Sequence, residues 1–282
     1  MAGILHVVAT PLGNLEDLSP RAKDTLGRAA LIACEDTRRT AKLLARCGLE
    51  RPMVAVHKFT ERERLDDVLA VLARGEDVAL VSDGGTPAIS DPGALLVAAA
   101  HAAGYVVSPV PGPSAVVAIL SASGLASDRF VFEGFLPSRA GERRNRLRAL
   151  AGDTRTVVVY EAPHRVRASL DDLAAILGSR TIVLGRELTK VYETILRGSA
   201  REVLAALGDG EIKGEIAIAI AGHDGADPPE LVEDDRLAIE WEKALAEASG
   251  DTRAALKAAA KALGIKKPEA WRRLAERGLV RD

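Results

Sequence analysis

The feature that most constrains the fold is a short apolar run that leads straight into a loop rich in glycine and proline. Residues 78–81 read VALV, which is typical of a buried strand, and the next twelve residues read SDGGTPAISDPG. An apolar helical stretch, ALLVAAAHAAG, and a second apolar run, YVVSPV, follow. Strand, loop, helix and strand in this order form a parallel crossover unit. The segment therefore predicts an α/β fold.

The loop at 82–93 is longer than a tight turn requires. In open parallel sheets, ligands bind beyond the carboxyl ends of the strands, and Gly84 and Gly85 fall at that end. Glycine lets the backbone approach a ligand closely, and Pro87 and Pro92 stiffen the chain. Neither G-x-G-x-x-G nor a Gly-Lys-Ser/Thr phosphate loop is present. We favour a loop that binds a ligand with backbone groups and small side chains over a turn without a ligand.

Strand and helix patterns continue to alternate through residue 222, and they predict two α/β domains, at 1–111 and 112–222. Several strands of the second domain show a period of two, which predicts a mixed sheet. Residues 223–236 are polar, acidic and proline-bearing, as in a linker. Residues 237–282 predict a small helical domain, with two helices around a glycine-containing turn. These helices form either a helix-turn-helix or a plain packing hairpin.

The composition excludes some classes of protein but leaves the partner open. A formal net charge of −2 neither demands nor excludes a nucleic acid, so any basic patch must be local. Cys34 and Cys47 form neither a disulfide framework nor a metal-binding spacing, so we expect no metal. The N-terminus lacks the features of a signal peptide, and no apolar run is long enough to span a bilayer. We expect a cytoplasmic protein with no membrane partner.

Seven motifs in a fixed order identify a family. They are VATPLGNLEDLSPRA, CEDTRRTAKLL, SDGGTPAISDPG, PGPSA, FEGFLP, YEAPHRV and GRELTKVYE. Together they closely resemble the rRNA small subunit methyltransferase I family, which has the tetrapyrrole methylase (class III) fold. The resemblance covers residues 3–222, and the C-terminal helices are similar to the small domain appended in that family. One motif alone is weak, but seven in order are specific.

The resemblance implies a reaction, a donor and a partner. It implies methyl transfer from S-adenosylmethionine to the ribose 2′-hydroxyl of a cytidine in the decoding region of 16S rRNA. The partner would be 16S rRNA or the 30S subunit, and related enzymes are homodimers. The donor would lie in the cleft between the two α/β domains. The matching donor-binding positions are Pro11, Gly13, Gly84, Gly85, Thr86, Ile89, Ser114, Ala115, Glu161 and Leu188.

One departure separates two branches of the fold. Tetrapyrrole-modifying members carry GGDP where this chain has GGTP, so Thr86 replaces an aspartate. This difference favours the rRNA branch over the alternative of a tetrapyrrole-type small-molecule methyltransferase. A non-catalytic RNA-binding module is a third interpretation, which the intact donor motifs disfavour.

Methyl transfer from a sulfonium requires alignment and exclusion of water rather than a metal. A proton acceptor would help, because a ribose hydroxyl is protonated at neutral pH. The candidates at predicted strand ends are Asp36, Glu187 and His57, and the sequence leaves the choice open. The alternative for Asp36 is a helix N-cap, for His57 a structural role, and for Glu187 a salt-bridged loop.

Arginines are concentrated in PSRAGERRNRLRAL, at 137–150, which has one acidic residue. We expect this segment to neutralise RNA phosphates, the alternative being a solvated helix face. The predicted RNA contacts are Arg38, Arg139, Arg143, Arg144, Arg146 and Lys190. The C-terminal IKKPEAWRR adds further cations around Trp271, which we expect to lie in the core.

Overall fold

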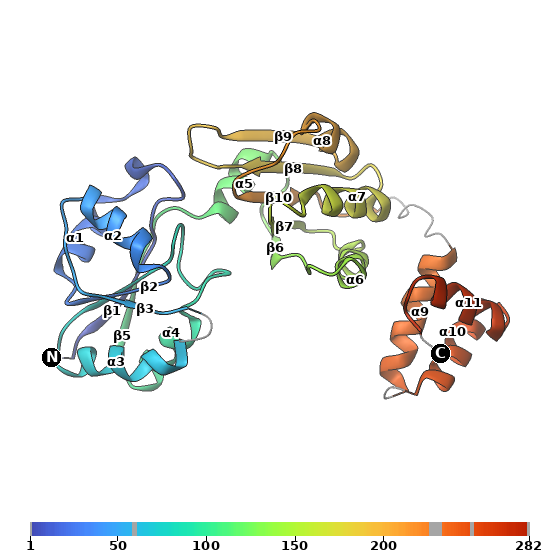
Figure 1. Cartoon of the computed structure of the whole chain (residues 1–282), viewed down its shortest axis with the longest axis horizontal. Helices are drawn as coiled ribbons and strands as arrows, with labels where there is room; N and C mark the ends of the chain where they lie inside the picture. The colour runs from blue at the N-terminus through green and yellow to red at the C-terminus, as the bar shows by residue number, and fades with distance from the viewer. Residues whose placement is uncertain (1, 58–60, 226–232, 249–250, 281–282) are drawn as a thin grey trace.

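The computed structural model describes residues 2–57, 61–225, 233–248 and 251–280. Two α/β units follow one another along the chain, and a helical unit lies at the C-terminal end (Figure 1). This arrangement confirms the predicted fold class.

The first unit is a five-stranded sheet in the order β3-β2-β4-β1-β5, and all of its strand pairs are parallel. Its strands are β1 (Ile4–Val8), β2 (Leu31–Cys34), β3 (Met53–Ala55), β4 (Val78–Val81) and β5 (Val106–Val110). Its helices are η1 (Leu15–Asp17), α1 (Pro20–Arg28), α2 (Thr37–Arg46), α3 (Glu61–Ala73) and α4 (Ala94–Ala102).

The central strand β4 shows why the apolar run VALV predicts this sheet. All four of its residues are buried. Val78 and Leu80 pack into one core, together with residues of α3 and α4, while Ala79 and Val81 pack into another with residues of α1 and α2. A parallel strand that is covered on both faces needs a continuous apolar run.

Helix ends in the first unit follow local sequence signals. Ser19 caps α1 and accepts a hydrogen bond of 3.1 Å from the Ala22 N–H, with Pro20 in the first turn, as the sequence predicts. The buried Glu61 carboxylate accepts hydrogen bonds from the Gly93 and Leu96 N–H groups, at 3.1 and 3.0 Å. A carboxylate favours the positive end of a helix, so Glu61 fixes α4 and the end of the 82–93 loop.

The second unit is a mixed five-stranded sheet in the order β6-β7-β10-β8-β9, as predicted. Strands β6 and β7 are parallel and the other pairs are antiparallel. The strands are β6 (Phe130–Phe135), β7 (Thr156–Glu161), β8 (Thr181–Arg186), β9 (Thr194–Ser199) and β10 (Ile216–Ile220). The helices are α5 (Ala115–Ser123), α6 (Ala140–Leu150), α7 (Val166–Leu177) and α8 (Ala200–Ala206).

Alternation along β10 shows how the two faces of this sheet differ. Ile216, Ile218 and Ile220 pack into the larger core, which α6, α7 and α8 cover, whereas Ala217 and Ala219 face α5. The small alanines let α5 lie close to the sheet.

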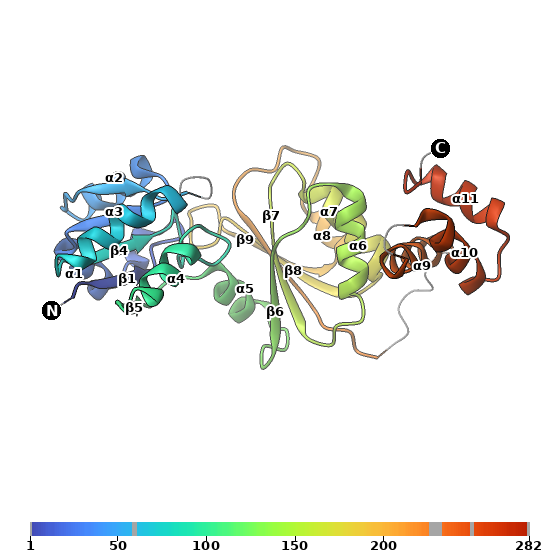
Figure 2. The same ribbon diagram turned by 90° about the horizontal axis from the view of Figure 1, so that it is seen from below.

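The C-terminal unit contains α9 (Glu233–Glu247), α10 (Thr252–Ala262) and α11 (Lys267–Glu276). They pack around Trp241 and Leu274, and the partly buried Trp271 packs against this cluster, as expected. Figures 1 and 2 both show this unit at the end of the molecule opposite the first sheet. None of the described helices is long and apolar enough to cross a membrane.

The structure corrects the predicted linker at 223–236. Residues 226–232 lie outside the described part of the chain, and α9 begins at Glu233, so the last four residues of that range belong to a helix. Acidic residues are favourable in the first turn of a helix because the helix dipole is positive there. The acidic run is therefore as compatible with a helix start as with a linker.

Candidate active site

A cavity of about 350 Å³ is lined by loops from both α/β units. This volume lies within the range of small-molecule sites. Eight of the ten predicted donor-binding residues line it: Gly84, Gly85, Thr86, Ile89, Ser114, Ala115, Glu161 and Leu188. The loop after β4 therefore contributes to a cavity, as its length and its glycines predict.

The glycines of this loop are needed for its contact with the first loop of the chain. Thr10 and Gly85 exchange two backbone hydrogen bonds of 2.9 Å. Gly85 has φ +87°, and a Cβ atom there would lie 3.2 Å from a methyl group of Leu12. Residues other than glycine seldom adopt this conformation. Gly85 therefore joins two loops that both contribute to the cavity wall.

Backbone strain occurs on both sides of the cavity. Ala88 and Ser90, with φ +65° and +66°, flank Ile89, while Glu187 and Thr189, with φ +53° and +68°, flank Leu188. No other non-glycine residue in the described part of the chain has a positive φ. Such strain costs free energy and is concentrated in functional sites. Both strained loops place an apolar side chain in the wall of the cavity.

Pro11 and Gly13, the other two predicted donor-binding residues, flank the cavity rather than line it. Leu12 between them lines the wall. The Pro11 carbonyl lies against Gly84, and a methyl group added at Gly13 would overlap the Lys190 side chain. Gly13 thus permits the first loop to pack against the loop after β8.

Asp83, Asp91 and Glu215 are carboxylates in the cavity wall that the sequence analysis did not select. Burial raises the pKa of Asp91, and the negative charges of Asp83 and Glu215 raise it further. Burial also raises the pKa of Asp83, although Arg39, at 3.2 Å, opposes this shift. Asp83 and Asp91 both lie within SDGGTPAISDPG, so the presence of two aspartates in this glycine-rich loop was the sequence feature that could have identified them.

Tyr160 and Phe135 supply the aromatic part of the wall. Their rings meet edge to face, with centroids 5.6 Å apart. Burial, with a smaller contribution from Asp91, raises the pKa of Tyr160 to about 12, so its hydroxyl stays protonated at neutral pH. Tyr160 can therefore donate a hydrogen bond into the cavity.

Comparisons with known proteins agree with this geometry. Residues 5–204 match the model of the tetrapyrrole (corrin/porphyrin) methylases. Over 238 residues the chain is 50% identical to the ribosomal RNA small subunit methyltransferase I of Xylella fastidiosa (strain Temecula1), covering 83% of this chain and 87% of the relative. The protein of the same name from Synechocystis sp. is 47% identical over 233 residues, covering 82% and 84%.

The chain belongs to the ribosomal RNA small subunit methyltransferase I family.

Solved structures share the fold of this family at low identity. The methyltransferase CobJ has a TM-score of 0.59 and 22% identity, covering 78% of this chain and 95% of CobJ. Uroporphyrin-III C-methyltransferase from Thermus thermophilus, in complex with S-adenosyl homocysteine, has a TM-score of 0.55 and 19% identity, covering 77% and 97%. At these identities the likeness shows the fold alone.

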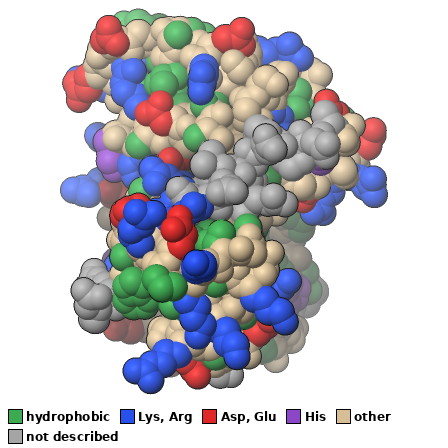
Figure 3. All heavy atoms as spheres, turned by 90° about the vertical axis from the view of Figure 1, so that its right-hand side faces the viewer, with side chains coloured by type: hydrophobic (Ala, Val, Ile, Leu, Met, Phe, Trp, Pro, Cys, Tyr) green, Lys and Arg blue, Asp and Glu red, His purple; other side chains and the backbone are tan. Residues whose placement is uncertain are grey.

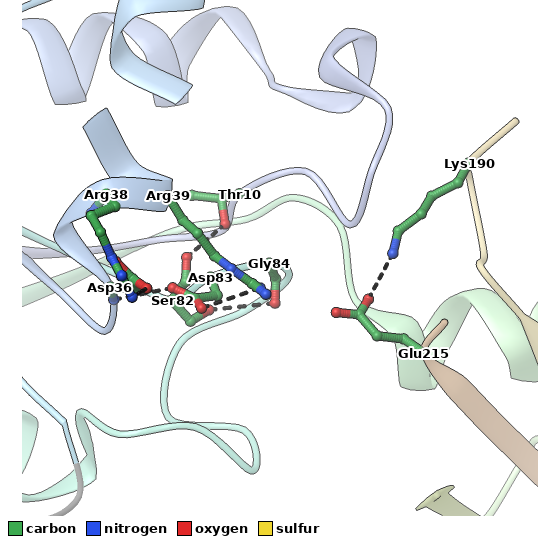
Figure 4. Close-up of polar contacts among 9 residues, drawn as sticks. All are labelled: Thr10, Asp36, Arg38, Arg39, Ser82, Asp83, Gly84, Lys190 and Glu215. Carbon is green, nitrogen blue, oxygen red and sulfur yellow. Dashed lines mark hydrogen bonds and ion pairs between the residues drawn. The ribbon is translucent and has the colours of Figure 1, made fainter. Parts of the chain in front are cut away.

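Asp36, one of the predicted proton acceptors, is the N-cap of α2. Its carboxylate accepts hydrogen bonds from the backbone and the guanidinium of Arg38, both at 2.8 Å (Figure 4). The bonds from Arg38 lower the pKa of Asp36 well below its ordinary value. Asp36 does not line the cavity, but its N–H donates to Asp83 at 3.1 Å. It therefore positions Asp83.

Glu187 and His57, the other predicted proton acceptors, also lie outside the cavity lining. Glu187 accepts hydrogen bonds from Lys190 at 2.7 Å and from the Glu215 N–H at 2.9 Å. Although partial burial opposes the shift, these bonds lower the pKa of Glu187. His57 follows β3, and its carbonyl accepts a hydrogen bond of 2.9 Å from the Glu61 N–H.

The Glu161 carboxylate is already engaged within the second unit. It pairs with Arg165 at 2.7 Å, accepts a hydrogen bond from the Ala162 N–H at 2.7 Å, and accepts another from the Ser169 hydroxyl. Because these partners occupy both of its oxygens, Glu161 fixes the end of β7 in the cavity wall.

The structure corrects the predicted role of Arg143. Its side chain is buried and pairs with the buried Asp172 of α7 at 2.7 Å. Arg144 shares the same carboxylate, at 2.7 Å, and Arg146 pairs with Glu133 of β6. The arginine-rich helix α6 is thus neutralised by acids distant in sequence, and Arg143 cannot reach a phosphate without breaking a buried ion pair.

The remaining predicted RNA contacts lie at the surface or beside the cavity. Arg38 and Arg139 are exposed. Lys190 pairs with Glu187 at 2.7 Å and with Glu215 at 3.2 Å, and Figure 4 shows the pair with Glu215. Lys190 therefore holds a carboxylate of the cavity wall in place.

Proposed function

We propose that this protein transfers a methyl group from S-adenosylmethionine to the ribose 2′-hydroxyl of a cytidine in the decoding region of 16S rRNA. A relative named ribosomal RNA small subunit methyltransferase I is 50% identical to this chain over 238 residues. The single observation that carries the proposal is the cavity between the two units. Its wall is built from the motif loops, including two segments with strained backbone that supply Ile89 and Leu188.

The cavity suits the donor in shape and charge. Gly84, Gly85 and Ala115 leave room along one wall, and Ile89 and Leu188 supply apolar surface for an adenine ring. Asp83, Asp91 and Glu215 supply negative charge for the cationic sulfonium and ammonium groups. Ser114 stands at the start of α5 without a side-chain capping bond, so its hydroxyl can bind a ligand.

S-adenosylmethionine, when bound, supplies an activated methyl group on a sulfonium. The chain has three tasks: to orient the nucleophile, to exclude water and to receive a proton. The apolar wall excludes water. As the hydroxyl oxygen bonds to the methyl carbon, the bond from that carbon to sulfur would break, its electron pair would stay on sulfur to leave a neutral thioether, and the hydroxyl proton must pass to a base. This scheme needs no metal, since the methyl group is already activated.

We place the proton acceptor at Asp91. Its carboxylate lines the cavity and pairs with no cation in the part of the chain that the structure describes. A raised pKa makes the ionised form a stronger base. Asp36 and Glu187 are weaker candidates because cations hold both carboxylates and lower their pKa values. His57 is weaker because it does not line the cavity.

The substrate would reach the cavity past several cations. We propose that Arg38, Arg139, Arg144, Arg146 and Lys190 contact phosphates on 16S rRNA or the 30S subunit. A ribosomal substrate would place the protein in the cytoplasm.

We also propose a homodimer, as the family resemblance implies. Val191 and Tyr192 are 93% and 80% exposed in the loop that leads to β9, the edge strand of its sheet. Exposed apolar groups beside an unpaired strand edge favour contact with a second copy. Sedimentation of the pure protein tests this proposal.

A methyl-transfer assay tests the function. The protein and radiolabelled S-adenosylmethionine are incubated with 30S particles lacking the modification, with naked 16S rRNA and with uroporphyrinogen III. Label in one cytidine, mapped by nuclease digestion and mass spectrometry, is the expected result. Label only in the tetrapyrrole would support the small-molecule alternative. Donor binding without any transfer would support a non-catalytic RNA-binding module.

A further inference from the structure

Charge is divided unequally among the three C-terminal helices. Within residues 237–247 of helix α9, Glu240, Glu242 and Glu247 are opposed by Lys243. The segment 252–277, which contains α10 and α11, carries only Glu269 and Glu276 as acids. Its exposed cations are Arg253, Lys257, Lys261, Lys266, Lys267, Arg272 and Arg277. Figure 3 looks at this end of the molecule, and Lys and Arg side chains gather on its lower half.

Helical spacing aligns the cations of α10. Arg253, Lys257 and Lys261 are four residues apart, so they form one stripe along the helix. Ala255 and Ala259, which are buried in the core of the unit, lie on the opposite side of the helix, and the buried Ala260 lies at the border of the stripe. The turn after α10 then brings Lys266 and Lys267 to the start of α11. We call the five residues Arg253, Lys257, Lys261, Lys266 and Lys267 the basic face.

The side chains of the basic face form no ion pair with an acid of the described chain, in contrast to Arg143, Arg144 and Arg146 of α6; the Asp251 carboxylate accepts only the backbone N–H groups of Arg253 and Ala254. Like charges four residues apart in a helix repel each other and destabilise the helix. A row of cations without acidic partners is therefore suited to binding an anion of another molecule.

The attachment of the C-terminal unit leaves the basic face accessible. The Asn145 amide of α6 donates a hydrogen bond to Glu242 of α9. Figures 1 and 2 both show α10 and α11 beyond α9, on the side away from the second sheet. The acidic helix thus faces the arginine-rich α6, and the basic helices form the end of the molecule.

We infer that the basic face binds the phosphate backbone of RNA at a position remote from the nucleotide that enters the cavity. This inference rests on the proposed rRNA substrate. Phosphate contacts need cations in a row, whereas base readout needs groups that reach base edges or stack on them. Trp271, the aromatic residue of α11, packs against the core of the unit, so base stacking is not its role. The basic face therefore adds affinity without sequence preference.

The experiment compares two triple variants that change net charge equally. Lys257→Gln, Lys261→Gln and Lys266→Gln remove three cations of the basic face. Arg21→Gln, Lys23→Gln and Arg62→Gln remove three exposed cations of α1 and α3, in the first unit. Binding to naked 16S rRNA is measured between about 0.05 and 0.2 M salt, the range over which phosphate contacts change affinity most visibly. Thermal unfolding and donor affinity are measured for both variants.

We expect the basic-face variant to lose about 2 units of the slope of log K against log salt, because each lost contact with single-stranded phosphate removes roughly 0.7. The control variant should keep the wild-type slope, and both should keep donor affinity and unfolding temperature. Equal slopes in the two variants would overturn the inference. A loss seen with 30S particles but not with naked rRNA would also overturn it, and would indicate a ribosomal protein as partner. If the wild-type protein methylates no rRNA, the proposed function is wrong. The salt dependence of rRNA binding still tests the basic face in that case, because it is measured without methyl transfer.

Discussion

At the scale of single residues, Asp91 shows a conflict between stability and reactivity. Its carboxylate is half-buried, and its raised pKa means that the folded protein holds the proton more tightly than the unfolded chain does. The ionised form therefore opposes folding at neutral pH, and protonation relieves this cost as the pH falls through the raised pKa. Burial is the first cause, and Asp83, Glu215, Glu35 and Tyr160 are the titratable groups that interact with Asp91.

Asp91→Asn should therefore retain or slightly raise the unfolding temperature while single-turnover methyl transfer falls by about 10²–10⁴-fold, the usual contribution of a general base. Donor and rRNA affinities should not change. Asp171→Asn, at an exposed site on α7, is the matched control and should change nothing. If Asp91→Asn retains turnover, Asp91 is not the base. The same assay is then applied to Asp83→Asn, and after that to Asp36→Asn and Glu187→Gln.

The wild-type enzyme should also lose turnover on acidification at a higher pH than an exposed aspartate would require. The reason is that the base must be ionised, and burial raises the pKa of Asp91. A single-turnover pH profile measures this effect. Asp83 and Glu35 also have raised pKa values, so the pH profile of Asp91→Asn must be measured as well. If turnover of Asp91→Asn falls with acidification at the same pH as in the wild-type enzyme, the titrating group is not Asp91.

Gly85→Val tests the loop on which the cavity depends. Valine is strained at φ +87°, and its side chain would meet Leu12. We expect the variant to fold and to lose donor affinity, because the paired loops at Thr10 and Gly85 form part of the wall. Calorimetric titration measures the affinity. If Gly85→Val binds S-adenosylmethionine with the affinity of the wild-type protein, this loop is not part of the donor site.

At the scale of elements, α6 is held to α7 by the buried pair of Arg143 and Asp172. Arg143→Ala would leave the buried Asp172 carboxylate with Arg144 as its remaining cation, so we expect the free energy of unfolding to fall by about 1–3 kcal/mol. Arg144→Ala removes the more exposed partner of the same carboxylate and should cost about 1 kcal/mol or less. Denaturant unfolding compares the two. Similar small losses would show that Arg143 is no more structural than its neighbour.

At the scale of the whole molecule, donor binding and RNA binding should be separable. The cavity is lined by residues between 12 and 217, and the core of the C-terminal unit shares no residue with the other cores. A chain that ends at residue 225 should therefore keep its donor affinity and bind rRNA more weakly. Isothermal titration and filter binding measure the two quantities. A loss of donor affinity would mean that the C-terminal unit supports the cavity.

The sequence determined the architecture because local patterns carry that information. The apolar run at 78–81 indicated a strand covered on both faces, and the motif loops lie at strand ends, where the topology brings them to one cavity. Eight of the ten predicted donor-binding residues line that cavity for this reason. Ser19 and Pro20 marked the start of α1 in the same local way.

Only the tertiary structure decided which charges are free to act. Arg143 and Asp172 are 29 residues apart, and Asp36 and Asp83 are 47 residues apart, so no local pattern showed that these groups are partners. Burial and pairing set the pKa of a carboxylate, and both depend on neighbours that folding brings together. For the same reason only the structure singled out Asp91 as a candidate base, and only the structure showed that Arg143, Arg144 and Arg146 of α6 are paired with acids while the side chains of the basic face form no ion pair in the described chain.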